Sequence, residues 1–186
     1  MHQSSTNGAL VRQIQFLKEV PLFMDLNDVA LEHLVHDLRL KSYRSKEIIF
    51  HQDDLGHELY IVLKGKVRVY KVSPSGDETT LIIMSKHDVF GEFAVIDGRP
   101  RSATARTIGA TELLAMSQDK FDVHFARMPE LARGVTRLLS YKLRWTASYA
   151  AAVAQYDAAA RLLHILLLYN EKFGQKREDG KGYELE

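Results

Sequence analysis

The spacing of hydrophobic and polar positions changes twice along the chain, which gives a helical start, a strand-rich middle and a helical end. Apolar residues recur at helical spacing between residues 10 and 20. Asn27 precedes a second periodic stretch and predicts a capped helix that runs to about Asp37. The polar residues 1–8 predict a disordered start.

Short apolar runs with turn signals between them fill the middle of the chain, from Leu38 to Ser117. The continuous run 59–63 is expected to be buried on both faces, and the Ser-Pro-Ser-Gly-Asp stretch at 73–77 predicts a hairpin turn. Regularly spaced short strands predict an α+β fold built on an antiparallel β-barrel or jelly roll (a double-stranded β-helix) with flanking N-terminal helices. The expected strands are residues 39–43, 47–50, 59–63, 66–72, 79–84, 106–108 and 112–116.

Two helices are predicted after the strands. Pro129 opens a helix that continues to about Tyr156 and carries two neighbouring apolar seams. A helix of this length favours a parallel homodimer through residues 129–156, although both seams could instead pack on the barrel. Asp157 predicts the N-cap of a further helix over 158–173, whose apolar residues cover more than one face and need more protein around them.

These patterns predict three parts: a barrel domain with its N-terminal helices at 1–128, a dimerisation helix at 129–156, and a hinge with the first helix of an incomplete domain at 157–186. A length of 186 residues with 46% hydrophobic and 26% charged residues fits one core and part of a second. The net charge of +1 gives no strong field toward nucleic acid.

The chain has no cysteine, which excludes disulfides, thiolate catalysis, iron–sulfur clusters and cysteine zinc sites. The polar start has no apolar signal segment, and the longest apolar run, residues 165–168, is too short to cross a membrane. We therefore expect a cytoplasmic location and no membrane contact.

The most informative stretch is residues 90–105, Phe-Gly-Glu-Phe-Ala-Val-Ile-Asp-Gly-Arg-Pro-Arg-Ser-Ala-Thr-Ala, which we call the 90–105 segment. Arg101 can meet a phosphate with a forked pair of charge-assisted hydrogen bonds, and Ser102 can add a hydroxyl. Gly91 permits close backbone approach, and residues 92–95 can form one helical turn with free N–H groups. Glu92 would repel phosphate but can accept from a sugar hydroxyl.

The 90–105 segment resembles the phosphate-binding cassette of cyclic-nucleotide-binding domains, in the version found in bacterial transcription regulators of the cAMP receptor protein/FNR type. Residues 20–34 and 53–67 resemble the same family, and the likeness extends from about Val20 to Phe173. One departure is Asp53, where the family often has glycine; aspartate tolerates turn conformations, so the turn is expected to survive.

The resemblance implies that Gly91 and Glu92 hold the ribose, and that Arg101 and Ser102 hold the phosphate of a cyclic nucleotide. It places Thr146 at the adenine amino group, but the next residue, a serine in the family, is Ala147 here. The expected ligand is cAMP, with cGMP or another cyclic nucleotide as alternatives. The ligand-binding residues expected in this way are Gly91, Glu92, Phe93, Ala94, Arg101, Ser102 and Thr146.

In that family the ligand lies between the barrel and the dimer helix, which implies allosteric control of DNA binding. The resemblance places most of a winged helix-turn-helix domain beyond Glu186, so DNA would be bound only through that domain.

Other functions compete with this interpretation. A cupin metalloenzyme needs a His-x-His pair, which is absent; His33 and His36 fall on the predicted N-terminal helix, so no metal site and no enzyme activity is expected. A haem sensor needs axial ligands, and His57 or His87 could be assigned to that role only by guesswork. A nucleotide-binding module without DNA function, as in kinase regulatory subunits or channels, also remains an alternative.

Overall fold

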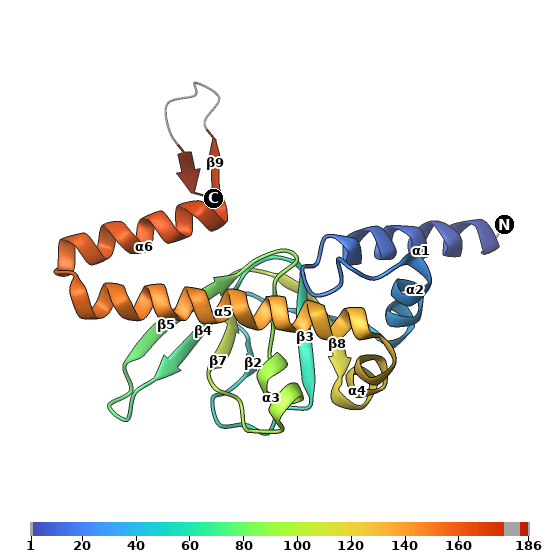
Figure 1. Cartoon of the computed structure of the whole chain (residues 1–186), viewed down its shortest axis with the longest axis horizontal. Helices are drawn as coiled ribbons and strands as arrows, with labels where there is room; N and C mark the ends of the chain where they lie inside the picture. Colours follow the sequence, from blue (N-terminus) through green and yellow to red (C-terminus); the bar gives the residue numbers. More distant parts are fainter. Residues whose placement is uncertain (1, 177–182, 186) are drawn as a thin grey trace. The chain divides into compact units, whose positions relative to one another are not determined.

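A computed structural model describes residues 2–176 and 183–185 of the chain (Figure 1). Its contacts divide the chain into two compact units, Met1–Arg137 and Leu138–Glu186, each of which has its own internal packing. No helix in the described ranges is both long and apolar enough to cross a membrane.

The first unit begins with helices α1 (His2–Lys18) and α2 (Asp28–Asp37). The Asn27 side chain accepts a hydrogen bond from the Ala30 amide at 2.9 Å, which confirms the predicted cap. The expected disorder is wrong for residues 2–8, because α1 already includes His2, and residue 1 lies outside the described residues. Once a helix is nucleated, each added residue gains a backbone hydrogen bond, so a polar stretch can extend it.

Eight strands of the first unit form two antiparallel four-stranded sheets, and the jelly-roll prediction is confirmed, with a barrel that is not closed. The first sheet has the order β1-β8-β3-β6 and the second the order β2-β7-β4-β5. The strands are β1 (Arg39–Tyr43), β2 (Ile48–Phe50), β3 (Glu58–Lys64), β4 (Val67–Val72), β5 (Glu78–Met84), β6 (Val89–Phe90), β7 (Thr104–Thr107) and β8 (Thr111–Ser117).

Aromatic rings join the two sheets. Phe50 of the second sheet lies 5.9 Å from Tyr60 and 6.0 Å from Phe90 of the first, measured between ring centroids. The predicted burial of the run 59–63 holds from Leu59 to Val62 in β3, whereas Leu63 is half-buried. Part of the core of the first unit therefore lies between the sheets, and another part is formed by buried residues of helices α1 and α2 and of the turns between them, such as Leu17, Phe23 and Leu34.

Two short elements frame the 90–105 segment: the two-residue strand β6 and the helix α3 (Glu92–Asp97). Sequence patterns predicted the helical turn but missed β6, which is too short to show a period. Strand β7 begins two residues before the predicted 106–108 run. The two additional residues, Thr104 and Ala105, are small and buried, and Thr104 Oγ1 accepts a hydrogen bond from the Gln52 amide at 2.9 Å.

Helix α4 (Gln118–Arg127) follows the sheets, and α5 (Pro129–Gln155) starts within the first unit and ends in the second. In the second unit, Asp157 caps α6 (Ala158–Phe173) by accepting from the Ala160 amide at 2.8 Å, as predicted. Arg161 donates to the Val153 carbonyl at 3.1 Å, and Trp145 meets Tyr169 edge-on at 5.8 Å. A short hairpin, β9 (Gly174–Lys176) with β10 (Tyr183–Leu185), lies at the end of the described chain where no strand was predicted.

Candidate functional site

Arg101 lies at the centre of the candidate site and is 5% exposed. Its Nη1 donates to the Gly91 carbonyl at 2.7 Å, and its Nη2 donates to the Glu58 carbonyl at 2.8 Å. Its Nε is buried and has no hydrogen-bond partner among the described residues. Because arginine carries five N–H donors, this buried cation keeps donors that the protein does not use.

The backbone of Arg101 is held as firmly as its side chain. Its amide donates to the Asp54 carbonyl at 2.8 Å, and its carbonyl accepts from the Asp53 amide at 2.9 Å. Asp53 has a φ of 68°, a left-handed conformation that aspartate tolerates better than most residues. The turn predicted to survive the change to Asp53 is therefore formed.

Two aromatic rings and two glycines surround the Arg101 guanidinium. Phe50 lies under it at 4.2 Å from ring centroid to Cζ, and Tyr60 lies at 5.8 Å. A Cβ on Gly56 would fall 2.4 Å from the Arg101 Nε, and one on Gly91 would fall 2.8 Å from Nη1. Any larger residue at either glycine would displace the guanidinium.

Glu92 is the second buried charge and is 2% exposed, although it begins the short helix α3. Gly91 precedes it with a φ of 77°, a left-handed conformation that lets the chain turn sharply from β6 into α3. Gly98 ends α3 with a φ of 67°, and its amide bonds to the Ala94 carbonyl at 3.1 Å. Glu92 lies close enough to Arg101 to favour the charged guanidinium.

The charges of the site act on one another. Burial lowers the pKa of Arg101, while the neighbouring Tyr60, Glu58 and Glu92 oppose that shift. Burial also tends to raise the pKa of Glu58, but hydrogen bonds from Lys41 Nζ at 2.6 Å and Tyr60 Oη at 2.8 Å hold it below its usual range. Burial and the bond to Glu58 raise the pKa of Tyr60. The site thus holds the buried Arg101 cation close to Glu58, whose charged form is stabilised by hydrogen bonds.

The other residues expected at the site differ in accessibility. Ala94 is buried, whereas Phe93 is 42% exposed and Ser102 is exposed. Thr146 belongs to the second unit, where its Oγ1 donates to the Lys142 carbonyl at 2.9 Å. The structure therefore brings Gly91, Glu92 and Arg101 together, and leaves Ser102 facing outward on the same loop.

Sequence reasoning missed the groups that hold Arg101 from behind: Phe50, Gly56, Glu58 and Tyr60. These lie more than forty residues before Arg101 in the chain, so no local pattern connects them with it. The segment 53–67 was singled out for its resemblance to the family, and that resemblance was the signal that could have found Gly56 and Glu58.

Two other histidines considered for chemistry, His33 and His36, are exposed on α2. Within the described ranges, no group of three or more His, Asp or Glu side chains is arranged to hold a metal ion.

The fold and the site define a jelly-roll domain with a partly unsatisfied, buried arginine in a glycine-lined loop, which is the architecture of a domain that binds a small anionic ligand. Residues 40–127 match the family described as the cyclic nucleotide-binding domain. Residues 40–127 therefore form a cyclic nucleotide-binding domain with homology to CRP-like regulators.

The relatives include the CRP-like cAMP-activated global transcriptional regulator of Mycobacterium tuberculosis, 29% identical over 160 residues, which are 86% of this chain and 71% of the relative. The cyclic AMP receptor protein of Thermus thermophilus is 34% identical over 128 residues, 69% of this chain and 59% of the relative. The solved structure of the Thermus thermophilus catabolite activator protein superposes with a TM-score of 0.64 at 25% identity, covering 89% of this chain and 93% of that one.

Proposed function

We propose that this chain is the ligand-sensing part of a CRP-type transcription regulator and that its ligand is cAMP. The observation that carries the proposal is the buried Arg101, whose guanidinium meets two backbone carbonyls and keeps a buried Nε without a partner among the described residues. A phosphodiester would satisfy such a group, because it accepts bidentate, charge-assisted hydrogen bonds.

In this proposal Arg101 and Ser102 bind the cyclic phosphate, and Glu92 accepts from the ribose 2′-hydroxyl beside Gly91. The burial of Glu92 next to Arg101 supports this assignment, because a sugar hydroxyl gives a buried carboxylate a neutral donor. Phe93 and Ala94, on the first turn of α3, lie beside these groups along the chain. Thr146 is assigned to the adenine amino group, and Ala147 in place of a serine leaves the choice of base less constrained.

The regulatory step follows from where the ligand-binding groups occur in the sequence. They come from the 90–105 segment and from the long helix, so a ligand that contacts both can favour one arrangement of barrel and helix. We infer that residues 129–156 form a homodimer and that residues 157–186 begin the DNA-binding part, in a cytoplasmic protein. Leu143 and Val153 of α5 are apolar and exposed. Exposed apolar residues of this kind support packing of the helix against a second copy of the chain.

The experiment that tests the proposal is calorimetric titration of the chain with cAMP, with cGMP as the comparison. Saturable binding of cAMP that is tighter than that of cGMP is the expected result. No heat and no thermal shift with either nucleotide, from a folded protein, would reject cAMP and point to a CRP-like sensor of another small ligand.

A further inference from the structure

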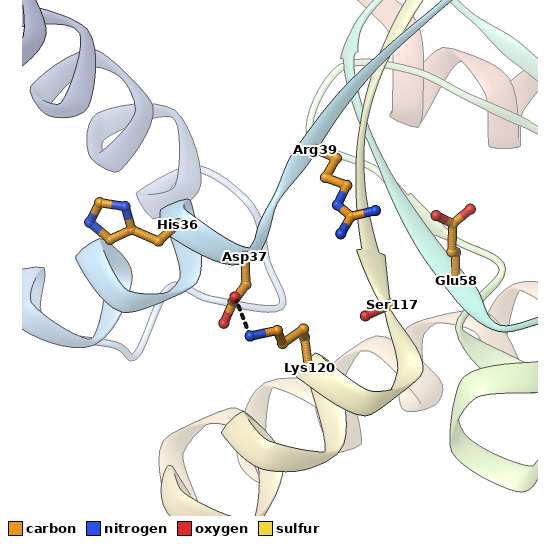
Figure 2. Close-up of a pocket in the computed structure, with 6 residues that line it drawn as sticks. All are labelled: His36, Asp37, Arg39, Glu58, Ser117 and Lys120. Carbon is orange, nitrogen blue, oxygen red and sulfur yellow. Dashed lines mark ion pairs between the residues drawn. The ribbon is translucent and has the colours of Figure 1, made fainter.

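A second polar pocket lies at one end of the first sheet, in the first unit (Figure 2). It has a volume of about 220 Å³ and is open to solvent. The end of α2, the start of β1 and of β3, the end of β8 and the first turn of α4 each contribute to it. Its lining residues are His36, Asp37, Arg39, Glu58, Ser117 and Lys120.

The two carboxylates of this pocket are already bound by protein cations. Asp37 pairs with Lys120 Nζ at 2.9 Å and with the buried His124 Nε2 at 2.9 Å. Glu58 pairs with Lys41 Nζ at 2.6 Å and accepts from Tyr60 Oη. The hydrogen bond from Lys120 lowers the pKa of Asp37, so both carboxylates are ionised and both are neutralised at pH 7.

Unlike the two carboxylates, the side chains of Arg39 and Ser117 make no hydrogen bond or ion pair with another group of the described chain. Arg39 is exposed, and Figure 2 shows its guanidinium directed into the space between Glu58 and Lys120. Ser117 stands at the N-cap of α4, yet its hydroxyl caps no amide and faces the same space. The His36 ring points away from the other lining residues.

We propose that this pocket is a binding site for a small oxyanion, with the chemistry of phosphate or of a short carboxylate. Arg39 would supply a forked pair of donors, Ser117 a hydroxyl and Lys120 a second positive charge. Lys120 pairs with Asp37, and Lys41, which lies outside the lining, pairs with Glu58, so the charge of Arg39 is left for an anion. The volume suits a small ion, since pockets for larger organic ligands are roughly 300–1,000 Å³.

The proposed oxyanion site is separate from the candidate nucleotide site. Only Glu58 belongs to both, and it uses different atoms: its carboxylate lines the pocket, whereas its backbone carbonyl accepts from Arg101. The proposal therefore does not depend on the identity of the nucleotide.

The test is titration of the chain with inorganic phosphate at constant ionic strength, followed by amide chemical shifts in nuclear magnetic resonance spectra. Malonate replaces phosphate in a parallel series, which separates the two kinds of oxyanion. We expect saturable shifts at residues 39, 117 and 120. Shifts confined to residues 91, 92 and 101 would instead place phosphate at the nucleotide site and overturn the proposal, as would no saturable shift with either anion.

Two variants sharpen the result. Arg39→Gln removes the free guanidinium and is expected to weaken phosphate binding roughly fivefold, the scale of an exposed charge pair. Arg44→Gln removes an equal charge from another exposed position, just beyond the opposite end of β1, and is expected to leave the affinity unchanged. Equal losses in the two variants would show a general charge effect and would contradict a built site.

Discussion

Gly56 and Arg101 are packed so closely that the first has no room for a side chain. A Cβ on Gly56 would lie 2.4 Å from the Arg101 Nε and 2.5 Å from its Cζ. The guanidinium cannot retreat easily, because Phe50 lies 4.2 Å from it and two carbonyls bind its Nη atoms. A residue that resembles an ordinary loop glycine therefore sets the position of the buried cation.

Gly56→Ala is accordingly expected to weaken cAMP binding by about tenfold while the chain stays folded. The added methyl group displaces the Arg101 side chain from the geometry that a phosphate requires. Calorimetry measures the affinity, and circular dichroism checks the fold. Gly109→Ala is the matched control, because a Cβ there meets nothing within 4 Å; an equal loss in both variants would contradict this explanation.

Arg101→Ala removes the proposed phosphate ligand itself. We expect a loss of about 2 kcal/mol or more of binding free energy, roughly 30-fold in affinity, because a buried charged hydrogen bond is lost. Arg99→Ala removes an exposed arginine two positions earlier and is expected to have little effect. If cAMP binds equally well to Arg101→Ala, the 90–105 segment is not the phosphate site.

The parts of the structure that could be predicted from sequence are those fixed by local interactions. The caps at Asn27 and Asp157 each satisfy an amide three residues away, so the cap and its helix are visible in one short window. Strand β1 was predicted with its observed bounds for the same reason. Strand β6 is held by pairing with β3, and nothing in its own two residues indicates that partner.

The candidate site shows the same limit. The charged and glycine residues of the 90–105 segment identified the chemistry, but the support for Arg101 comes from β2, β3 and the loop between them. These contacts form only when the two sheets pack together, so the local pattern of apolar and polar residues cannot predict them. The pair formed by Asp37 and His124, which joins α2 to α4, is of the same kind.

Gly134 gives a test of packing rather than of binding. A Cβ at this helical glycine of α5 would lie 1.9 Å from the Leu22 backbone carbonyl oxygen, where no flexible atom can give way. Gly134→Ala is expected to lower the free energy of unfolding by about 2 kcal/mol, although glycine-to-alanine changes in helices usually stabilise by up to about 1 kcal/mol.

Chemical denaturation measures this change. Gly8→Ala is the matched helical control, because its Cβ would meet only the Arg12 side chain at 3.8 Å, an ordinary contact. A Gly134→Ala protein as stable as the parent would mean that α5 does not approach Leu22 so closely.

Acid stability should depend on Glu58. Its hydrogen bonds to Lys41 and Tyr60 hold its pKa below the usual 4.5, so the unfolded chain binds more protons than the folded one in this range. The stabilisation is fully present above pH 4.5 and is lost as the pH falls through the lowered pKa of the folded state. In the Glu58→Gln variant, the free energy of unfolding is expected to decrease less between neutral pH and pH 3 than in the parent protein. Urea denaturation at each pH measures this free energy. An unchanged slope would show that the Lys41–Glu58 pair contributes nothing to it.

The base contact proposed for Thr146 can be separated from its role in the helix. Thr146 and Thr136 are both exposed on α5, and each donates to the carbonyl four residues earlier at 2.9 Å. Valine keeps the branched shape and removes only the hydroxyl, so the two substitutions disturb the helix alike.

If Thr146 binds the adenine amino group, Thr146→Val should weaken cAMP binding about fivefold, the scale of one hydrogen bond, and leave cGMP binding nearly unchanged. Thr136→Val should alter neither affinity. Calorimetry with both nucleotides on both variants distinguishes the possibilities. Equal behaviour of the two variants would leave the Thr146 hydroxyl with a helical role alone, and base selection would then have to come from the 90–105 segment or from another part of the long helix.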